Sequence, residues 1–171
     1  MKKPSSAIQG VGLGLRWDFI DEILERKPKL AFVEISPENY MGRGGYYDES
    51  LDRAKDVWPI VTHGLTMSIG GVDPLRADYL ASLRAFLERT KSPWHSDHLC
   101  FSTSAGVVLH DLLPLSFKRA EVTRIADRIK RAQDAIGRPM AVENVSFYLH
   151  PGKSEMTEAE FVASVCEAAD C

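Results

Sequence analysis

The sequence predicts an α/β fold in which strands and helices alternate along the chain. Five apolar runs with strand character are each followed by a longer segment of helical periodicity, at the roughly 30-residue intervals typical of βαβ units. Four of the five runs also end in a histidine or a carboxylate. Alternation of this kind produces a parallel sheet with right-handed crossovers.

The N-terminal third is expected to hold the first two strand–helix units. The glycine-rich stretch Gly10–Leu15 predicts the first strand, and Trp17–Arg26 carries apolar residues at helical spacing. Leu30–Ile35 is nearly continuous in apolar residues, as buried parallel strands are. A proline and three glycines predict a loop at Ser36–Gly45, and a helix is expected at Tyr46–Val57.

The middle of the chain repeats this order. The third strand, Pro59–Gly64, leads into a long loop, Leu65–Asp73. Asp73 is expected to cap a helix that runs to Thr90, with a proline at the favoured first helical position. The fourth strand is expected within Lys91–Phe101.

The C-terminal third completes the pattern. Cys100–Pro114 is expected to be a loop, and the helix that follows is expected to be capped by Ser116 and ended by Gly137. Pro139–Asn144 predicts the fifth strand. A Thr-x-x-Glu capping box predicts the start of the last helix, Thr157–Ala169.

Two architectures fit these five units: an open doubly wound sheet and the first part of a TIM-type (β/α) barrel. A doubly wound sheet collects its site at one switch point, whereas a barrel gathers every strand end around one mouth. Ligand-type residues follow strands two to five alike, so the pattern favours the barrel. A whole barrel needs about 250 residues, so residues 1–171 are expected to form one domain with the N-terminal five or so βα units.

Composition narrows the classes of function. The net charge of −3 and the pI of 6.0 give no general attraction to nucleic acid or to an anionic membrane. No apolar run approaches the roughly 20 residues that a membrane span needs, and no signal-peptide core follows the N-terminus, so a cytoplasmic location is expected. The three cysteines are too few and too scattered for a disulfide framework.

The strand ends predict a metal site. His63, His98 and Glu143 close three neighbouring strands, and imidazoles with a carboxylate suit iron, manganese or zinc. Strand alternation points His95 and Asp97 to one face and His98 to the other, unless the extended geometry breaks at the strand end and all three converge. Both a redox-active iron and a Lewis-acid metal remain open at this stage.

Other polar residues lie close to these strand ends. Glu34 stands inside an apolar strand, where an unpaired carboxylate is costly, so a partner or a metal is expected. Glu38 and Asn39 follow in the loop, where they face solvent, cap a helix or face substrate. Asn144 is either a weak amide ligand or a hydrogen-bonding residue behind the ligands.

Five motifs in the same order resemble the multinuclear non-haem iron-dependent oxidative enzymes (MNIO), a family that includes the methanobactin-biosynthesis oxidase. The motifs are Gly12–Arg16, Val33–Tyr40, His63–Gly70, Ser96–Cys100 and Val142–Val145. They extend over nearly the whole chain, and several motifs in the right order are more specific than any one of them.

The resemblance implies a xylose-isomerase-type barrel with two or three irons, which uses dioxygen to modify residues, commonly cysteines, of a ribosomally made precursor peptide in natural product biosynthesis. It also implies a small partner protein that presents the peptide's leader. Carried over by motif, the metal-binding residues are His63, His98, Glu143, Asp97 and Asn144, and the substrate pocket is lined by Glu34, Glu38 and Asn39, joined by His95 from outside the motif.

We therefore expect an iron- and dioxygen-dependent oxidoreductase. Members of the family continue with further strands that supply Asp, Asn, His and Glu ligands, so this sequence is expected to be the N-terminal part of a longer barrel. Two alternatives stay open: a divalent-metal isomerase or hydrolase with a sugar-like substrate, and a non-catalytic binding module or remnant. The sequence leaves open the catalytic residues, the peptide and homo-oligomer formation.

Overall fold

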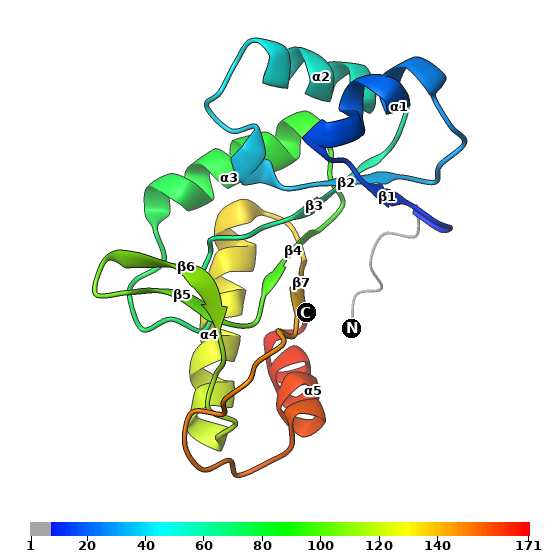
Figure 1. Ribbon diagram of the computed structural model, residues 1–171. Helices are drawn as coiled ribbons and strands as arrows, with labels where there is room; N and C mark the ends of the chain where they lie inside the picture. The colour runs from blue at the N-terminus through cyan, green and yellow to red at the C-terminus, as the bar shows by residue number, and fades with distance from the viewer. Residues whose placement is uncertain (1–7) are drawn as a thin grey trace.

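The computed structural model describes residues 8–171, so the N-terminal segment used above to predict location lies outside them. A five-stranded parallel sheet forms its centre (Figure 1). The strands are β1 (Leu13–Gly14), β2 (Val33–Ile35), β3 (Ile60–His63), β4 (His95–His98) and β7 (Met140–Glu143). The predicted parallel α/β sheet is therefore confirmed.

The strands lie side by side in the order β1-β2-β3-β4-β7, which is also their order along the chain. All four pairings are parallel. This order lacks the reversal that marks a doubly wound sheet and is the order of consecutive barrel strands. Within residues 8–171 the sheet is open, with β1 and β7 at its edges.

Helices cover one face of the sheet. They are α1 (Ile20–Arg26), α2 (Tyr46–Lys55), α3 (Ala77–Thr90), α4 (Arg119–Ile136) and α5 (Glu158–Ala169), with short 3-10 turns at Trp17–Phe19 and Pro37–Asn39. Each helix lies beside the next one along the chain (Figure 1). Among the described residues, no helix has the length and apolar character needed to cross a membrane.

The core explains which face the helices cover. Val33, Ile35 and Ile60 are buried against α1 and α2, and Met140 is buried against α3, α4 and α5. Residues that alternate with these point to the opposite face, where Glu34 and Glu143 are exposed. We call this second face, which no described helix covers, the open face of the sheet.

One predicted loop is wrong. Most of Cys100–Pro114 forms an antiparallel hairpin of β5 (Phe101–Ser104) and β6 (Val107–Leu113). Ala105 and Gly106 make the turn, with φ of 51° and 77°. The sequence does not reveal the hairpin, because β6 is mostly exposed and lacks the alternation of apolar and polar residues that a half-buried strand shows.

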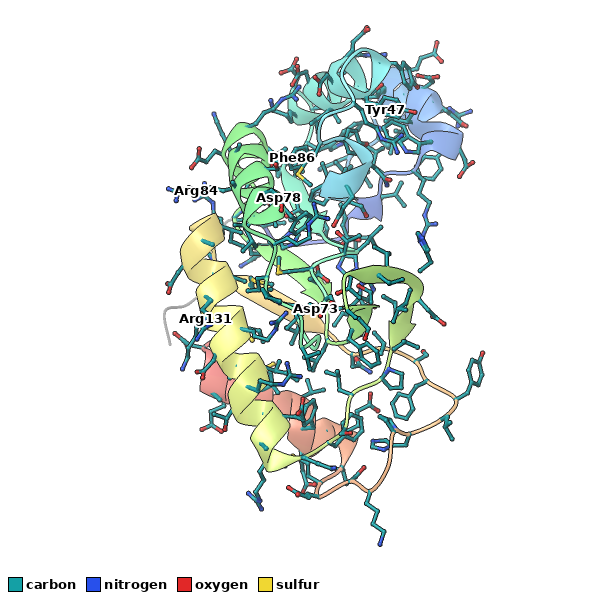
Figure 2. All side chains as sticks on the ribbon, turned by 90° about the vertical axis from the view of Figure 1, so that its left-hand side faces the viewer. Tyr47, Asp73, Asp78, Arg84, Phe86 and Arg131 are labelled. Carbon is teal, nitrogen blue, oxygen red and sulfur yellow. The ribbon has the colours of Figure 1, made fainter. Side chains whose placement is uncertain are left out.

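Two predicted helix caps are also wrong. Arg76 and Lys118, not Asp73 and Ser116, stand at the N-caps of α3 and α4. Asp73 instead accepts hydrogen bonds from the backbone N–H groups of the hairpin turn, at 3.2 and 3.0 Å, and lies beside the hairpin in Figure 2. The end of α4 at Gly137 and the capping box at Thr157 are confirmed.

Candidate metal centre

Three side chains from neighbouring strand ends converge on the open face. His63, His98 and Glu143 are the last residues of β3, β4 and β7. The Nε2 atom of His63 lies 3.3 Å from Nε2 of His98 and 3.4 Å from Oε2 of Glu143. One ligand atom from each residue lies within 4.8 Å of the other two. We call these residues the triad.

The register of the sheet brings the triad together. His98 pairs with Glu143 across β4 and β7, and His63 pairs with Ser96 across β3 and β4. Paired residues of parallel strands point to the same face, and so do residues two apart on one strand. The three ligand-type side chains therefore share a face, although they lie far apart in sequence.

The triad fits a divalent transition metal. Ligand bonds of about 2.1 Å at a tetrahedral angle would place neighbouring ligand atoms about 3.4 Å apart, close to the separations of His63 from His98 and from Glu143. Two imidazoles and a carboxylate suit iron, manganese or zinc. The side chain of His63 is 15% exposed and that of Glu143 is 57% exposed, so a metal held here could be reached from the open face.

On the helix-covered face, β3 and β4 carry a group of buried polar side chains. His95 is fully buried and Asp97 is 1% exposed. Thr62 Oγ1 lies 3.1 Å from His95 Nδ1, and His95 Nε2 lies 3.8 Å from Asp97 Oδ2. Strand alternation thus persists to the end of β4, and the structure does not bring His95 or Asp97 into the triad.

Asp97 supports the backbone around the triad. Its carboxylate accepts hydrogen bonds from the backbone N–H of His98 at 2.7 Å and of Met67 at 3.4 Å. Gly64 packs directly against this group, because a Cβ placed there would collide with Asp97 Oδ2 and lie 2.7 Å from His95 Nε2. Only glycine allows the chain to turn this closely after His63.

The loop after β3 is held by two arginines of α4. Arg124 donates to the carbonyl oxygens of Gly71 and Gly70 at 2.6 and 2.7 Å. Arg128 donates to three further carbonyls of the same loop at 2.8, 2.8 and 3.2 Å, and its burial lowers the pKa of its guanidinium. These bonds fix the segment that follows His63, and with it the edge of the site.

Glu38 joins loops rather than the triad. Its Oε1 accepts hydrogen bonds from Tyr79 Oη at 2.7 Å, from the backbone N–H of Leu65 at 3.0 Å and from Thr66 Oγ1 at 3.1 Å. Burial, and then the charge of Glu38, raises the pKa of Tyr79. Asn39 is half-buried beside it.

Glu34 and Asn144 are both exposed. Glu34 lies on the open face, so burial does not impose a partner on it. Asn144 Nδ2 donates to Glu158 Oε1 at 3.2 Å, at the start of α5, and the structure does not bring it to the triad.

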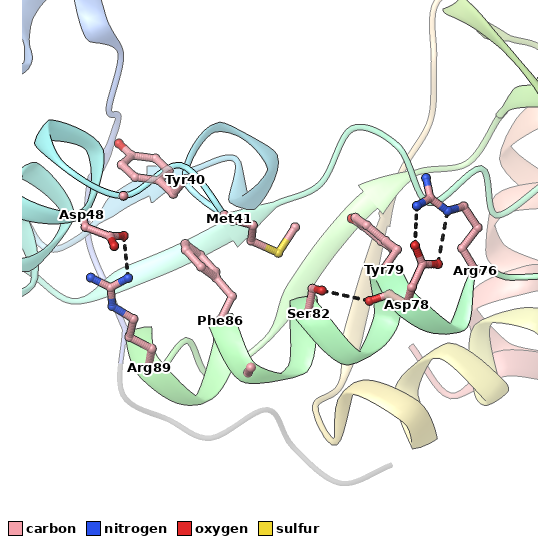
Figure 3. Close-up of a pocket in the computed structure, with 12 residues that line it drawn as sticks. Tyr40, Met41, Asp48, Arg76, Asp78, Tyr79, Ser82, Phe86 and Arg89 are labelled. Atoms are coloured by element: carbon pink, nitrogen blue, oxygen red, sulfur yellow. Dashed lines mark hydrogen bonds and ion pairs between the residues drawn. The ribbon is translucent and has the colours of Figure 1, made fainter.

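A separate groove of about 450 Å³ lies between α3 and the segment 40–48 (Figure 3). Tyr40, Met41, Tyr79 and Phe86 contribute to its apolar lining. The arginines that line it are already paired, Arg76 with Asp78 at 2.6 Å and Arg89 with Asp48 at 2.6 Å. The positive charges of these arginines are therefore balanced by their acidic partners, and the groove includes no residue of the triad.

Comparison with known proteins places the chain in a family. A family model described as "RiPP precursor modification enzyme MbnB/TglH/ChrH" matches residues 10–171, where RiPP denotes a ribosomally synthesised and post-translationally modified peptide. The chain belongs to this family. The resemblance based on the five sequence motifs is thus confirmed.

Relatives in this family carry the designation UPF0276. The chain is 43% identical over 162 residues to a UPF0276 protein of Acinetobacter baylyi, with 95% of this chain and 56% of the relative covered. It is 40% identical over 167 residues to one of Neisseria meningitidis serogroup C (96% and 59%) and 38% identical over 162 residues to one of Shewanella sediminis (94% and 58%). The chain spans a little over half the length of these relatives.

Proposed function

We propose that this chain contributes part of the metal site of an iron- and dioxygen-dependent oxidoreductase that modifies a precursor peptide, at cysteine. The family match supports peptide modification. The observation that carries the proposal is the convergence of His63, His98 and Glu143 at one edge of the sheet. Further residues beyond a single triad are needed for two or three irons, and we propose that the remaining length of the relatives' fold supplies them.

Each residue of the site has its own proposed role. His63 and His98 would offer imidazole nitrogens to the metal, and Glu143 would offer a carboxylate that can bridge two cations. A bound iron would supply one-electron chemistry with dioxygen and would favour the thiolate form of a substrate cysteine. Asp97 would keep His98 in place by accepting the hydrogen bond from its backbone N–H.

The open face is the proposed side of substrate approach. Glu143 and Glu34 are both exposed there, so Glu34 is placed to meet a peptide beside the metal. Glu38 and Asn39 would shape this approach through the loop after β2, and His95 and Asn144 would act by holding the strand ends. A small protein that presents the peptide's leader is the proposed partner, and the cytoplasm, where cysteines stay reduced, is the proposed location.

Metal content tests the proposal. The full-length protein should be purified without oxygen and measured by mass spectrometry of its metals, beside His63→Ala, His98→Ala and Glu143→Ala variants. We expect two or three irons in the natural protein and a loss of at least one in each variant. His110→Ala is the matched control, because His110 is exposed on β6, and it should keep its iron.

Stoichiometric zinc or manganese that the three substitutions leave in place would reject the proposal. Zinc or manganese lost on substitution would keep the triad as a metal site but point to the divalent-metal isomerase or hydrolase. Iron retained by all three variants would show that the triad is not a ligand set.

A further inference from the structure

Ser96 lies directly behind one histidine of the triad. Its Oγ is 2.9 Å from Nδ1 of His63, on the side of the ring away from the triad contacts. The same hydroxyl donates a hydrogen bond to the backbone carbonyl of Thr62 at 3.3 Å. The register accounts for this position, since Ser96 pairs with His63 and precedes His98 by two residues on β4.

Only one arrangement of hydrogens makes both contacts hydrogen bonds at once. A hydroxyl has one hydrogen to donate, and a carbonyl oxygen can only accept. If the Ser96 hydrogen goes to the Thr62 carbonyl, Ser96 Oγ is left as the acceptor for His63, and Nδ1 of His63 must carry the hydrogen. In a neutral imidazole the other nitrogen, Nε2, then holds a free lone pair.

That lone pair points into the triad. Nε2 of His63 is the atom that lies 3.3 Å from His98 Nε2 and 3.4 Å from Glu143 Oε2. A hydrogen bond to the far nitrogen of a metal-binding histidine commonly selects its tautomer and orients its ring. We propose that Ser96 is a positioning residue, which holds His63 in the Nδ1-protonated form and so presents Nε2 to a divalent transition metal.

Among the described residues, none holds the second histidine of the triad in this way. Nδ1 of His98 is buried and has no hydrogen-bond partner within residues 8–171. Its ring is held by burial and by an edge-on contact with His63, with ring centroids 4.6 Å apart. The pre-set ligand of the pair is therefore His63, and the inference rests on the proposed metal centre without depending on iron or on oxidase activity.

The first test reads the tautomer in metal-free protein. The full-length protein, labelled with ¹⁵N at histidine, should show His63 protonated at Nδ1, with its signals assigned by the His63→Gln variant. Ser96→Ala should abolish this preference, and Ser96→Thr, which keeps a hydroxyl, should restore it. Ser102→Ala is the matched control, because it removes a hydroxyl that is buried but has no partner among the described residues.

The second test measures metal affinity by anaerobic titration with Fe²⁺ and, separately, with Co²⁺. Ser96→Ala should weaken binding by about 10- to 100-fold, the range seen when the residue behind a ligand is removed. Ser96→Thr and Ser102→Ala should bind as the natural protein does. Circular dichroism shows whether each variant is folded.

Several outcomes would overturn the inference. They are a His63 that is protonated at Nε2 in the natural protein, a Ser96→Ala variant that keeps both tautomer and affinity, or a folded Ser96→Thr variant that restores neither. A protein that binds Co²⁺ as expected but carries zinc in the cell would reject the proposed oxidase and leave the role of Ser96 intact.

Discussion

The two faces of β3 and β4 carry the same kinds of residue in opposite surroundings. On the helix-covered face, Thr62, His95 and Asp97 are buried and bond to one another or to backbone N–H groups. On the open face, His63 and His98 direct their Nε2 atoms at each other. The difference shows that strand alternation, and not residue type, decides which histidines reach the triad.

The largest expected effect comes from Gly64, in the turn after β3, which packs against Asp97 and His95 of the helix-covered face. Gly64→Ala would force a Cβ into Asp97 and His95, which are buried and would break hydrogen bonds if they shifted. We expect a loss of about 3 kcal/mol or more in the free energy of unfolding, because overpacking beside buried polar groups adds strain to broken contacts. Urea denaturation measures it.

Gly14→Ala is the control for that substitution. Gly14 lies in strand β1, and a Cβ there meets nothing within 4 Å. Its free energy of unfolding should change by no more than about 0.5 kcal/mol. Equal losses in the two variants would mean that both glycines matter only for the backbone and that the packing of Gly64 against the buried group is unimportant.

A paired substitution separates a structural carboxylate, Asp97, from a proposed metal ligand, Glu143. Asp97→Asn replaces an acceptor of two backbone N–H groups and should lower the free energy of unfolding by about 1–3 kcal/mol. Glu143→Gln changes an exposed side chain and should leave that energy within about 0.5 kcal/mol, while it weakens Co²⁺ binding more than Asp97→Asn does. Chemical denaturation and metal titration of both variants supply the comparison.

The reverse pattern would give Asp97 a different role. If Asp97→Asn removed the metal and left the free energy of unfolding unchanged, Asp97 would be a ligand despite its place on the helix-covered face. The comparison between the faces would then fail at its central residue.

Sequence patterns predict the alternation of strands and helices because each unit has a local signal. Leu30–Ile35 and Pro59–Gly64 are apolar runs, and the capping box at Thr157 is a short-range motif. The alternation of side chains along a strand also predicts, from the sequence alone, that His98 points to the opposite face from His95 and Asp97. The sequence-predicted candidates that the structure brings together, His63, His98 and Glu143, each end a strand of this kind.

Features that depend on contacts between distant loops could not be predicted. Asp73 has the sequence context of a helix cap, yet its carboxylate holds the turn of a hairpin more than 30 residues away. Ser96 gives no chemical signal in the sequence, because its contact with His63 follows from the register of β3 and β4. Glu34 is exposed because no described helix covers its face, which an apolar strand pattern cannot reveal.

The smallest expected effect is a change in stability above neutral pH that comes from a buried thiol, Cys100. Burial, and then the charges of Asp97 and Asp111, raises the pKa of the Cys100 thiol to about 12. In the unfolded chain the thiol loses its proton at about pH 8.5. Between these values the folded state binds a proton that the unfolded state has lost, so stability should be full below about pH 8.5 and decline as the pH rises toward 12.

Urea denaturation at pH 7, 9 and 10 measures this decline. Cys100→Ala should show a shallower fall in the free energy of unfolding than the natural protein, because it removes one of the protons that folding retains. Ser102→Ala is the control, since Ser102 is also buried but does not ionise in this pH range, and it should leave the slope unchanged. A Cys100→Ala variant with the full slope would mean that the thiol ionises in the folded state as it does in the unfolded chain, and that water reaches it there.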